Sequence, residues 1–263
     1  MDYDVGSIVS RNSHNNDILF KVTSISGNTV YLKGLDLRLY ADSDIADLRI
    51  EKEINNSDRE ITTKNIQELN LNRDKYFYLP GKVMHIDGDE DYLERCMKFY
   101  KDLKVKAFGI TLKENEISNY LKLNLKKYNP DILVITGHDA YYKNRNNKYQ
   151  NTAYFIDAVK EARKYEKDQN KLIIISGACQ SNYEELIKAG SNFASSPKRI
   201  NIHALDPAII ASSIAFSDKN KSIDLISIIE KTKYGSSGIG GIITNGTMFV
   251  GYPRWWLQKL EIW

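Results

Sequence analysis

Ile132-Leu133-Val134-Ile135-Thr136-Gly137-His138-Asp139 decides the fold of this chain, together with a second stretch of the same design, Leu172-Ile173-Ile174-Ile175-Ser176-Gly177-Ala178-Cys179-Gln180. Each begins as a short aliphatic run, too short for a free-standing helix, and ends in a glycine followed by a reactive side chain. Continuous apolar runs of this length are typical of strands buried on both faces of a parallel sheet. The two stretches therefore predict an α/β fold with a parallel sheet.

His138 and Cys179 occupy matching places in these two stretches. In open α/β sheets the functional site lies just beyond the carboxyl ends of the strands. If the two strands are neighbours, both side chains emerge at one edge of the sheet, where the imidazole can take the thiol proton. Cys179 also precedes a predicted helix, whose N-terminus would favour the thiolate. The pair predicts a cysteine hydrolase.

The residues around these stretches alternate between strand and helix patterns. Apolar periodicity predicts further strands near 82–87, 105–110 and 200–203, and helices near 152–165, 183–189, 207–216 and 223–231, besides two amphipathic helices that carry Tyr92 to Phe99 and Ile117 to Leu125. Such alternation predicts a three-layer α/β domain with right-handed crossovers, which we place at residues 79–263.

Residues 1–52 follow a different pattern. Short strand candidates near 7–9, 18–22, 29–32 and 47–50 are separated by turns rich in Asn, Asp and Gly. This spacing predicts a small SH3-like β-barrel, a module that is used more often for binding than for catalysis. The polar stretch 53–78 is predicted to be a linker.

Composition narrows the class of protein. The 263 residues carry 37 Lys and Arg against 34 Asp and Glu, a net charge of +3 that gives no reason to expect a nucleic acid or a membrane surface as partner. No apolar run approaches the roughly 20 residues that span a bilayer, and the first residues lack the pattern of a secretory signal. With only two cysteines, Cys96 and Cys179, we expect a cytoplasmic enzyme in a reducing compartment. Cys96 lies on the apolar stripe of a helix and is expected to pack in the core.

The sequence lacks the motifs of several other reaction classes. A phosphatase loop requires Arg six positions after its cysteine, where this chain has Glu185. The sequence contains no Gly-x-x-x-x-Gly-Lys phosphate loop and no His-Glu-x-x-His zinc helix.

The order strand–His followed by strand–Ala-Cys resembles the caspase-like cysteine peptidases. The closer resemblance is to the YabG family, the sporulation-specific peptidases of spore-forming bacteria. It covers nearly the whole chain and is carried by the opening Gly6-x-Ile8-Val9 and by the segments 137–140, 176–181 and 192–207. The match to caspases is looser, since Asp139 stands where they have Gly and Gly177 stands where they have Gln.

The YabG resemblance implies a cysteine endopeptidase that processes spore coat or cortex-related proteins in the mother cell, with its own chain left open as a substrate and the spore coat as a second location. Cys179 would attack the scissile carbonyl, and His138 would protonate the leaving amine and then activate water. The backbone of the turns at Gly137, Asp139 and Ala178 would help to hold the oxyanion. No metal, organic cofactor, nucleic acid or membrane is implied.

A preference for basic residues at the cleaved position is expected from relatives of the caspase-like class, which bind Arg or Lys in an acidic pocket. Asp206 and Asp87 fall near the ends of predicted strands and are the candidate pocket carboxylates, with Asp206 slightly favoured and His203 as a further pocket residue.

Two alternatives stay open. In the first, Gly177 to Ser181 form a nucleophile elbow of the amidotransferase or DJ-1-like kind, with His203 as the base. In the second, the chain is a non-catalytic spore coat scaffold whose β module binds partners, and Cys179 is inert.

Overall fold

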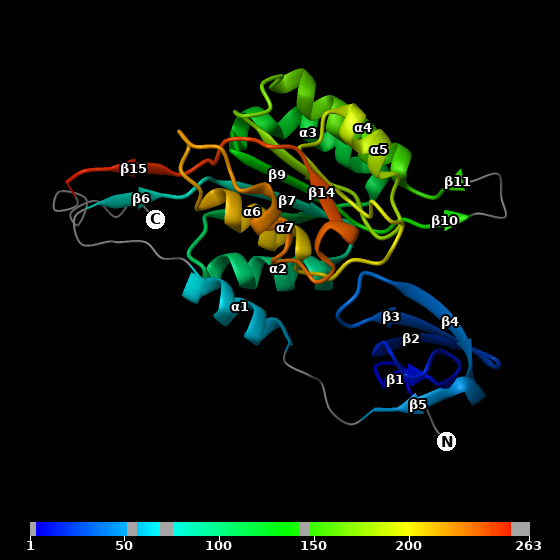
Figure 1. Ribbon diagram of the computed structural model, residues 1–263. Coiled ribbons are helices and arrows are strands. Elements are labelled where there is room, and N and C mark those ends of the chain that lie inside the picture. The colour runs from blue at the N-terminus through cyan, green and yellow to red at the C-terminus, as the bar shows by residue number, and fades with distance from the viewer. Residues whose placement is uncertain (1–3, 52–56, 69–75, 143–147, 254–263) are drawn as a thin grey trace. The chain divides into compact units, whose positions relative to one another are not determined.

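The computed structural model describes residues 4–51, 57–68, 76–142 and 148–253, and the chain divides into two compact units after Glu60 (Figure 1). The predicted linker contains one helix, α1 (Ser57–Glu68), and its remaining part beyond 68 lies largely outside the described residues.

The first unit is a five-stranded antiparallel sheet with the strand order β4-β3-β2-β1-β5. Alternate residues of its strands point inward and form one small core, made of Val9, Phe20, Val22, Val30, Leu32 and Leu48. Four strands fall where the sequence predicted them, and β4 was missed because its residues are polar. The strands are β1 (Ile8–Arg11), β2 (Phe20–Ser26), β3 (Thr29–Gly34), β4 (Tyr40–Asp44) and β5 (Leu48–Ile50).

The second unit contains a six-stranded sheet with the order β14-β13-β12-β9-β7-β8. All neighbouring pairs are parallel except β13 and β14, so the sheet is mixed and the prediction of a purely parallel sheet was wrong at this edge. The strands are β7 (Val83–Asp87), β8 (Ala107–Thr111), β9 (Ile132–Thr136), β12 (Ile173–Ser176), β13 (Phe193–Ser195) and β14 (Ile239–Gly241).

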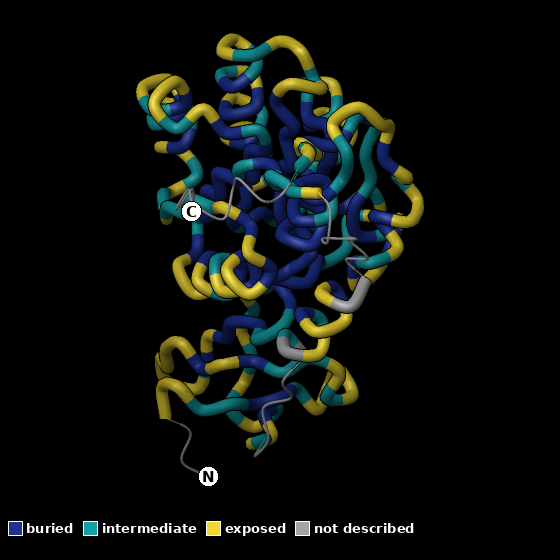
Figure 2. Tube along the Cα trace, turned by 90° about the vertical axis from the view of Figure 1, so that its left-hand side faces the viewer, coloured by how far each residue is buried: buried dark blue, intermediate teal, exposed yellow. Residues whose placement is uncertain are grey.

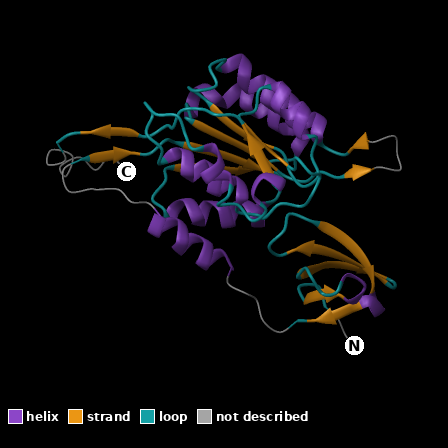
Figure 3. Ribbon diagram, viewed as in Figure 1, coloured by secondary structure: helices purple, strands orange, loops and turns teal. Residues whose placement is uncertain are grey.

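Helices cover both faces of this sheet, as the α/β prediction requires (Figure 1). One layer holds α2 (Glu90–Asp102), α6 (Asp206–Ala215) and α7 (Leu225–Ile229); the other holds α3 (Glu114–Tyr128), α4 (Thr152–Tyr165) and α5 (Tyr183–Ala189). Figure 3 shows the strands enclosed between the two groups of helices.

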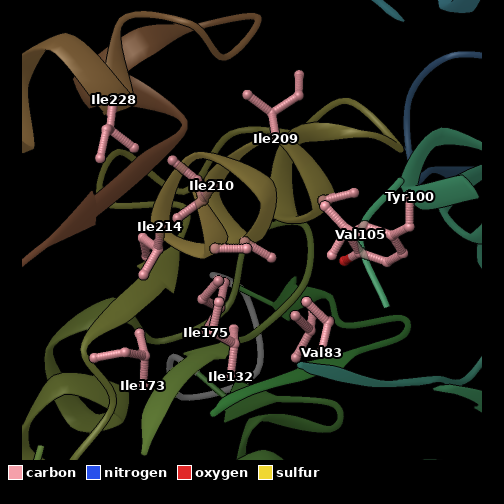
Figure 4. Packing of buried hydrophobic residues seen from close by; sticks show 14 of the residues in the cluster. Val83, Tyr100, Val105, Ile132, Ile173, Ile175, Ile209, Ile210, Ile214 and Ile228 are labelled. Carbon is pink, nitrogen blue, oxygen red and sulfur yellow. The ribbon is translucent and has the colours of Figure 1, made fainter. Parts of the chain in front are cut away.

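The aliphatic runs fill both interfaces because successive residues of a strand point to opposite faces. Ile132, Val134, Ile173 and Ile175 pack in the cluster with α2 and α6, whereas Leu133, Ile135 and Ile174 pack in the cluster with α3 and α4. Figure 4 shows the first cluster, in which Ile210 and Ile214 of α6 meet the sheet. Every residue of β7, β9, β12 and β13 is buried, and Figure 2 shows the buried residues gathered in the interior.

Two small ribbons complete the described part of the second unit. They pair β6 (Phe77–Leu79) with β15 (Phe249–Gly251), and β10 (Tyr141–Tyr142) with β11 (Lys148–Tyr149). Within the described ranges, no helix combines the length and the apolar character that a bilayer crossing requires.

The strand predicted at 200–203 is not formed. Ser196 and Arg199 adopt left-handed backbone angles, with φ of 61° and 56°, and these angles interrupt an extended chain. The strand of this region is β13 instead, and the segment 196–203 is a loop that runs along the carboxyl end of the sheet.

Candidate active site

His138 and Cys179 follow neighbouring parallel strands, so the condition that the sequence left open is met. Ile135 of β9 is the register partner of Ser176 of β12, and the N–H of Gly177 donates to the carbonyl of Ile135 at 3.0 Å. His138 lies three residues after Ile135, and Cys179 lies three residues after Ser176, so the two occupy equivalent positions past this pair. Since paired strands lie about 4.8 Å apart, the two loops leave the sheet side by side.

The turn that carries Cys179 depends on a glycine. Gly177 has a φ of 100°, and a Cβ there would lie 2.8 Å from Leu186 Cδ1. Both the positive φ and the lack of room for a Cβ therefore require glycine at this position. Helix α5 begins only at Tyr183, with Asn182 as its cap. The expectation that Cys179 lies at a helix N-terminus was therefore wrong.

The sulfur of Cys179 is almost covered. The residue is 3% exposed, and its Sγ accepts the backbone N–H of Ile202 at 3.3 Å. This contact brings the 196–203 loop against Cys179. Cys96 behaves differently, since its thiol donates to the carbonyl of Ala204 inside the core, where the sequence placed it.

His138 lies between two carboxylates. Its Nε2 is 3.6 Å from Asp89 Oδ2, and its Nδ1 is 4.0 Å from Glu114 Oε1. The backbone N–H of His138 donates to the same Glu114 oxygen at 2.8 Å. The Tyr92 ring packs against the imidazole, with 5.9 Å between ring centroids.

Asp139 connects the two loops. Its Oδ1 accepts the backbone N–H groups of Ala140 and Asn151, at 2.9 and 2.8 Å. Its Oδ2 accepts the hydroxyl groups of Ser181, at 2.9 Å, and of Thr152. Because Ser181 lies two residues after Cys179, this buried carboxylate fixes the histidine loop to the cysteine loop.

Ser181 and Gln180 extend this connection. The Ser181 hydroxyl also accepts the N–H of Ala178 at 2.9 Å, and Gln180 Oε1 accepts the N–H of Tyr141 at 3.2 Å. Gln180 itself has a φ of 59° and donates its N–H to Ser196 Oγ at 2.9 Å. The turn at Cys179 is thereby bound to two other loops.

The predicted pocket residues lie inside the protein. Asp87 is fully buried and accepts the Thr136 hydroxyl at 2.7 Å and the N–H of Asp89 at 3.0 Å. Asp206 is fully buried too, and its two oxygens accept the N–H groups of His203 and Lys233, each at 2.9 Å.

His203 is buried beside Asp206, and its Nδ1 accepts the N–H of Leu205 at 3.2 Å. Its backbone follows Ile202, which contacts the sulfur of Cys179. The three pocket candidates are thus near the edge of the sheet, with their polar atoms engaged by the chain itself.

Sequence reasoning missed Asp89 and Glu114. Asp89 follows β7 at the same edge of the sheet, so the rule that found His138 could also have found it. Glu114 is the first residue of α3, far from His138 in sequence. No local pattern marks its contact with His138.

The site lies at a topological switch point, where the order in which strands are added to the sheet reverses. From β7 the chain first adds β8 on one side, and then crosses to place β9 on the other side of β7. In doubly wound sheets a crevice opens outside the strand ends at such a point. Asp89 follows β7 and His138 follows β9, the two strands that flank it.

Comparison with known proteins identifies the family of this chain. The family profile described as YabG peptidase U57 matches residues 4–253. The chain belongs to the YabG peptidase family. It is 38% identical to the sporulation-specific protease YabG of Bacillus subtilis (strain 168), over 96% of this chain and 99% of that protein.

The YabG match spans both units, so the β unit is part of the sequence that the family shares. The chain is therefore a member of a peptidase family. No solved structure matches the chain.

Proposed function

We propose that this YabG-family peptidase is a cysteine endopeptidase in which Cys179 is the nucleophile and His138 the general acid and base. The observation that carries the proposal is the placement of both residues at equivalent positions past the neighbouring strands β9 and β12. In a peptidase, a thiol and an imidazole on adjacent loops are suited to acyl transfer. This arrangement of a strand–His and a strand–Cys is the basis for proposing a caspase-like catalytic domain.

The reaction uses only groups of the chain. Cys179 Sγ attacks the scissile carbonyl, and His138 protonates the leaving amine and then activates water. The N–H of Cys179, with a second donor from the turn of Gly137 and Asp139, is proposed to hold the oxyanion. The N–H of His138 donates to Glu114 and that of Ala178 to Ser181, so neither is offered to substrate in this conformation. The chemistry requires no metal or organic cofactor.

The substrates are proposed to be spore coat or cortex-related proteins, in keeping with the sporulation-specific relative. Cleavage after basic residues is supported by the acidic groups at this edge of the sheet. Asp87 and Asp206 would have to give up internal hydrogen bonds to bind a substrate directly, whereas Asp89 and Glu114 keep 5% and 15% of their side-chain surface exposed. A peptide-library profile that favours acidic or aromatic residues at the cleaved position would contradict this preference.

The remaining assignments follow from the same proposal. The peptidase would act in the mother-cell cytoplasm or at the spore coat, and residues 1–52 would form an SH3-like module that selects protein substrates. Residues 53–78 would connect this module to the catalytic domain at 79–263.

Replacement of the nucleophile tests the mechanism. Cys179→Ala is expected to abolish peptide cleavage while the melting temperature stays within a few degrees, since one nearly covered sulfur contributes little to the core. Cys96→Ala is the matched control, and it should keep most activity while losing about 1 kcal/mol of stability. Comparable activity in the two variants would refute the cysteine mechanism and favour the scaffold alternative.

One observation favours a second candidate, the nucleophile elbow with His203 as base: the backbone N–H next to His203 contacts Cys179 Sγ. Alanine variants of His138 and His203 distinguish the two candidate mechanisms. If His138 is the base, His138→Ala lowers kcat/KM by several orders of magnitude without changing the melting temperature. His203→Ala mainly lowers the melting temperature, because it removes the acceptor of the Leu205 N–H. The reverse ranking of kcat/KM would establish the elbow class.

A further inference from the structure

The imidazole of His138 is approached by a carboxylate at each ring nitrogen. The distances are 3.6 Å from Nε2 to Asp89 and 4.0 Å from Nδ1 to Glu114. The two acids come from different parts of the fold, since Asp89 precedes α2 and Glu114 begins α3. His138 is 20% exposed at its side chain, so the charges meet where water screens them only partly.

Asp89 is held in place independently of His138. Its Oδ1 accepts the N–H of Tyr92 at 3.2 Å and thereby caps α2, while its own N–H donates to Asp87 at 3.0 Å. Behind Asp87, a fully buried network runs through Thr136 to His85 and the Tyr100 hydroxyl. The other oxygen of Asp89, Oδ2, is the one that faces the imidazole.

The Glu114 carboxylate fits between two glycines that follow strands β7 and β9. Its Oε1 occupies the place between Gly88 and Gly137, where an added Cβ would lie only 2.4 and 2.5 Å away, respectively. The same oxygen accepts the N–H of His138 at 2.8 Å. The absence of side chains at these two glycines therefore lets a carboxylate reach the backbone and the ring of the histidine.

Two carboxylates stabilise the protonated form of an imidazole, because an opposite charge within about 4–6 Å favours the charged state. The Tyr92 ring also packs against the imidazole. Asp139 directs its oxygens to Ala140, Asn151, Thr152 and Ser181. Asp89 and Glu114 each place a carboxylate oxygen within 4.0 Å of a nitrogen of the His138 ring.

We propose that Asp89 and Glu114 are positioning residues that keep His138 as an imidazolium, so that Cys179 and His138 rest as a thiolate–imidazolium pair. The inference rests on the proposed function. The thiol proton resides on the imidazole before substrate binds; the thiolate forms the S–C bond, and the imidazolium protonates the nitrogen as the C–N bond breaks. Water then gives its proton to the imidazole and its oxygen to the acyl group, which releases the carboxylic acid and restores the pair.

The pH profile of kcat/KM tests the proposal, since its alkaline limb reports loss of the proton from the essential acid of the free enzyme. Asp89→Asn keeps an N-cap acceptor for Tyr92, and Glu114→Gln keeps an acceptor for the His138 N–H, so each removes mainly the charge. We expect each variant to move the alkaline limb about one unit toward lower pH, and the double variant to move it further. Asp224→Asn is the matched control, because Asp224 also caps a helix, through Ser227, but on α7. The alkaline limb of the kcat/KM profile of this variant should stay at the wild-type pH.

Gly88→Ala provides a second perturbation. Its Cβ displaces the Glu114 carboxylate, which ends a flexible side chain, and lies 3.2 Å from Gly137 Cα, so the backbone of the histidine loop must also yield slightly. The melting temperature of the variant is measured to establish that the fold is retained. We expect the same direction of shift together with a loss of kcat. If the limb stays in place in both Asp89→Asn and Glu114→Gln, the proposal is overturned. That result, combined with an inactive Cys179→Ala, would leave the cysteine mechanism intact, whereas an active Cys179→Ala would reject the mechanism itself.

Discussion

Asp139 is the residue on which the geometry of the site most depends. Each of its oxygens accepts two hydrogen bonds, and the donors belong to three segments: the histidine loop, the start of α4 and the cysteine loop. Its neighbour in sequence is the proposed base, yet the carboxylate positions the backbone of the loops. A residue of this kind acts on catalysis through geometry, and its effect can be measured separately from that of the reacting groups.

Replacing Asp139 by Asn should therefore impair both activity and stability. The amide supplies an N–H₂ group where Ser181 and Thr152 now donate, which costs about 1–3 kcal/mol of unfolding free energy. We expect kcat/KM to fall by about 10- to 100-fold as the loops separate. Asp218→Asn, which alters an aspartate that accepts one N–H from Asn220, is the control. Wild-type kcat/KM in Asp139→Asn would show that the loops hold their positions without this carboxylate.

The positions of His138 and Cys179 could be predicted because both follow buried aliphatic strands, whose register is forced by the core. Glu114 could not be predicted, since its contact arises only when the crossover from β8 to β9 brings the start of α3 against the histidine loop. Asp87 ends β7, as expected, whereas the strand expected before Asp206 is not formed and Asp206 begins α6. The hydrogen bonds of both carboxylates to the backbone do not follow from the sequence.

At the scale of the elements, one arginine side chain attaches the 196–203 loop to two neighbouring elements. Arg199 Nε donates to the Tyr149 hydroxyl at 2.8 Å, and its Nη2 contacts Glu184 Oε2 at 2.5 Å. The loop that reaches Cys179 through Ile202 is therefore attached to both β11 and α5. Sequence periodicity missed this loop and β13, because three residues are too few to show a strand pattern and left-handed turns carry no apolar signal.

Glu184→Gln should loosen this loop. Because the ion pair is partly exposed, stability should change by less than about 1 kcal/mol, while kcat/KM should fall several-fold as Ile202 loses its fixed contact with Cys179. Glu185→Gln is the matched control, since it removes an exposed ion pair to Lys188 on the same helix. An equal effect of the two substitutions on kcat/KM would contradict the role of Arg199.

The same ion pair has a defined pH dependence. Burial tends to raise the pKa of Glu184, but the hydrogen bond and charge of Arg199 outweigh it and bring that pKa below the ordinary 4.5. A carboxylate with a lowered pKa in the folded state stabilises the protein fully above its unfolded pKa and loses this contribution as pH falls. The loop attachment should thus be complete above about pH 4.5 and weaken below it, which hydrogen exchange of the 196–203 amides can follow.

At the scale of the whole molecule, the division into two units determines which truncations can be informative. The larger unit begins within α1, and Ile61 packs against the core cluster that α2 and α6 form with the sheet. A chain that started near Tyr76 would lose this packing. The sequence predicted the main strands and helices of the larger unit from β7 to α5 because each has its own apolar pattern, but it missed β13 and the antiparallel strand β14.

A chain beginning at Ser57 should therefore cleave a short peptide with nearly wild-type kcat/KM, because it retains α1 and every proposed catalytic residue. The same chain should process a folded coat protein poorly if the β unit selects substrates. The comparison of the two substrates on one preparation is the measurement, with circular dichroism to establish folding. Loss of peptide cleavage in a folded preparation would show that the β unit contributes to the active site.

The late position of β14 in the chain has a consequence for synthesis on the ribosome. β13 borders β12, the strand that precedes Cys179, and its outer edge is paired only when residues 239–241 have emerged. Until then the growing chain exposes an open strand edge, which invites association with other chains. Nascent or prematurely terminated chains that lack residue 239 onward should depend on chaperones for solubility and should have no peptidase activity. The peptidase can therefore begin to act only when its translation is nearly complete.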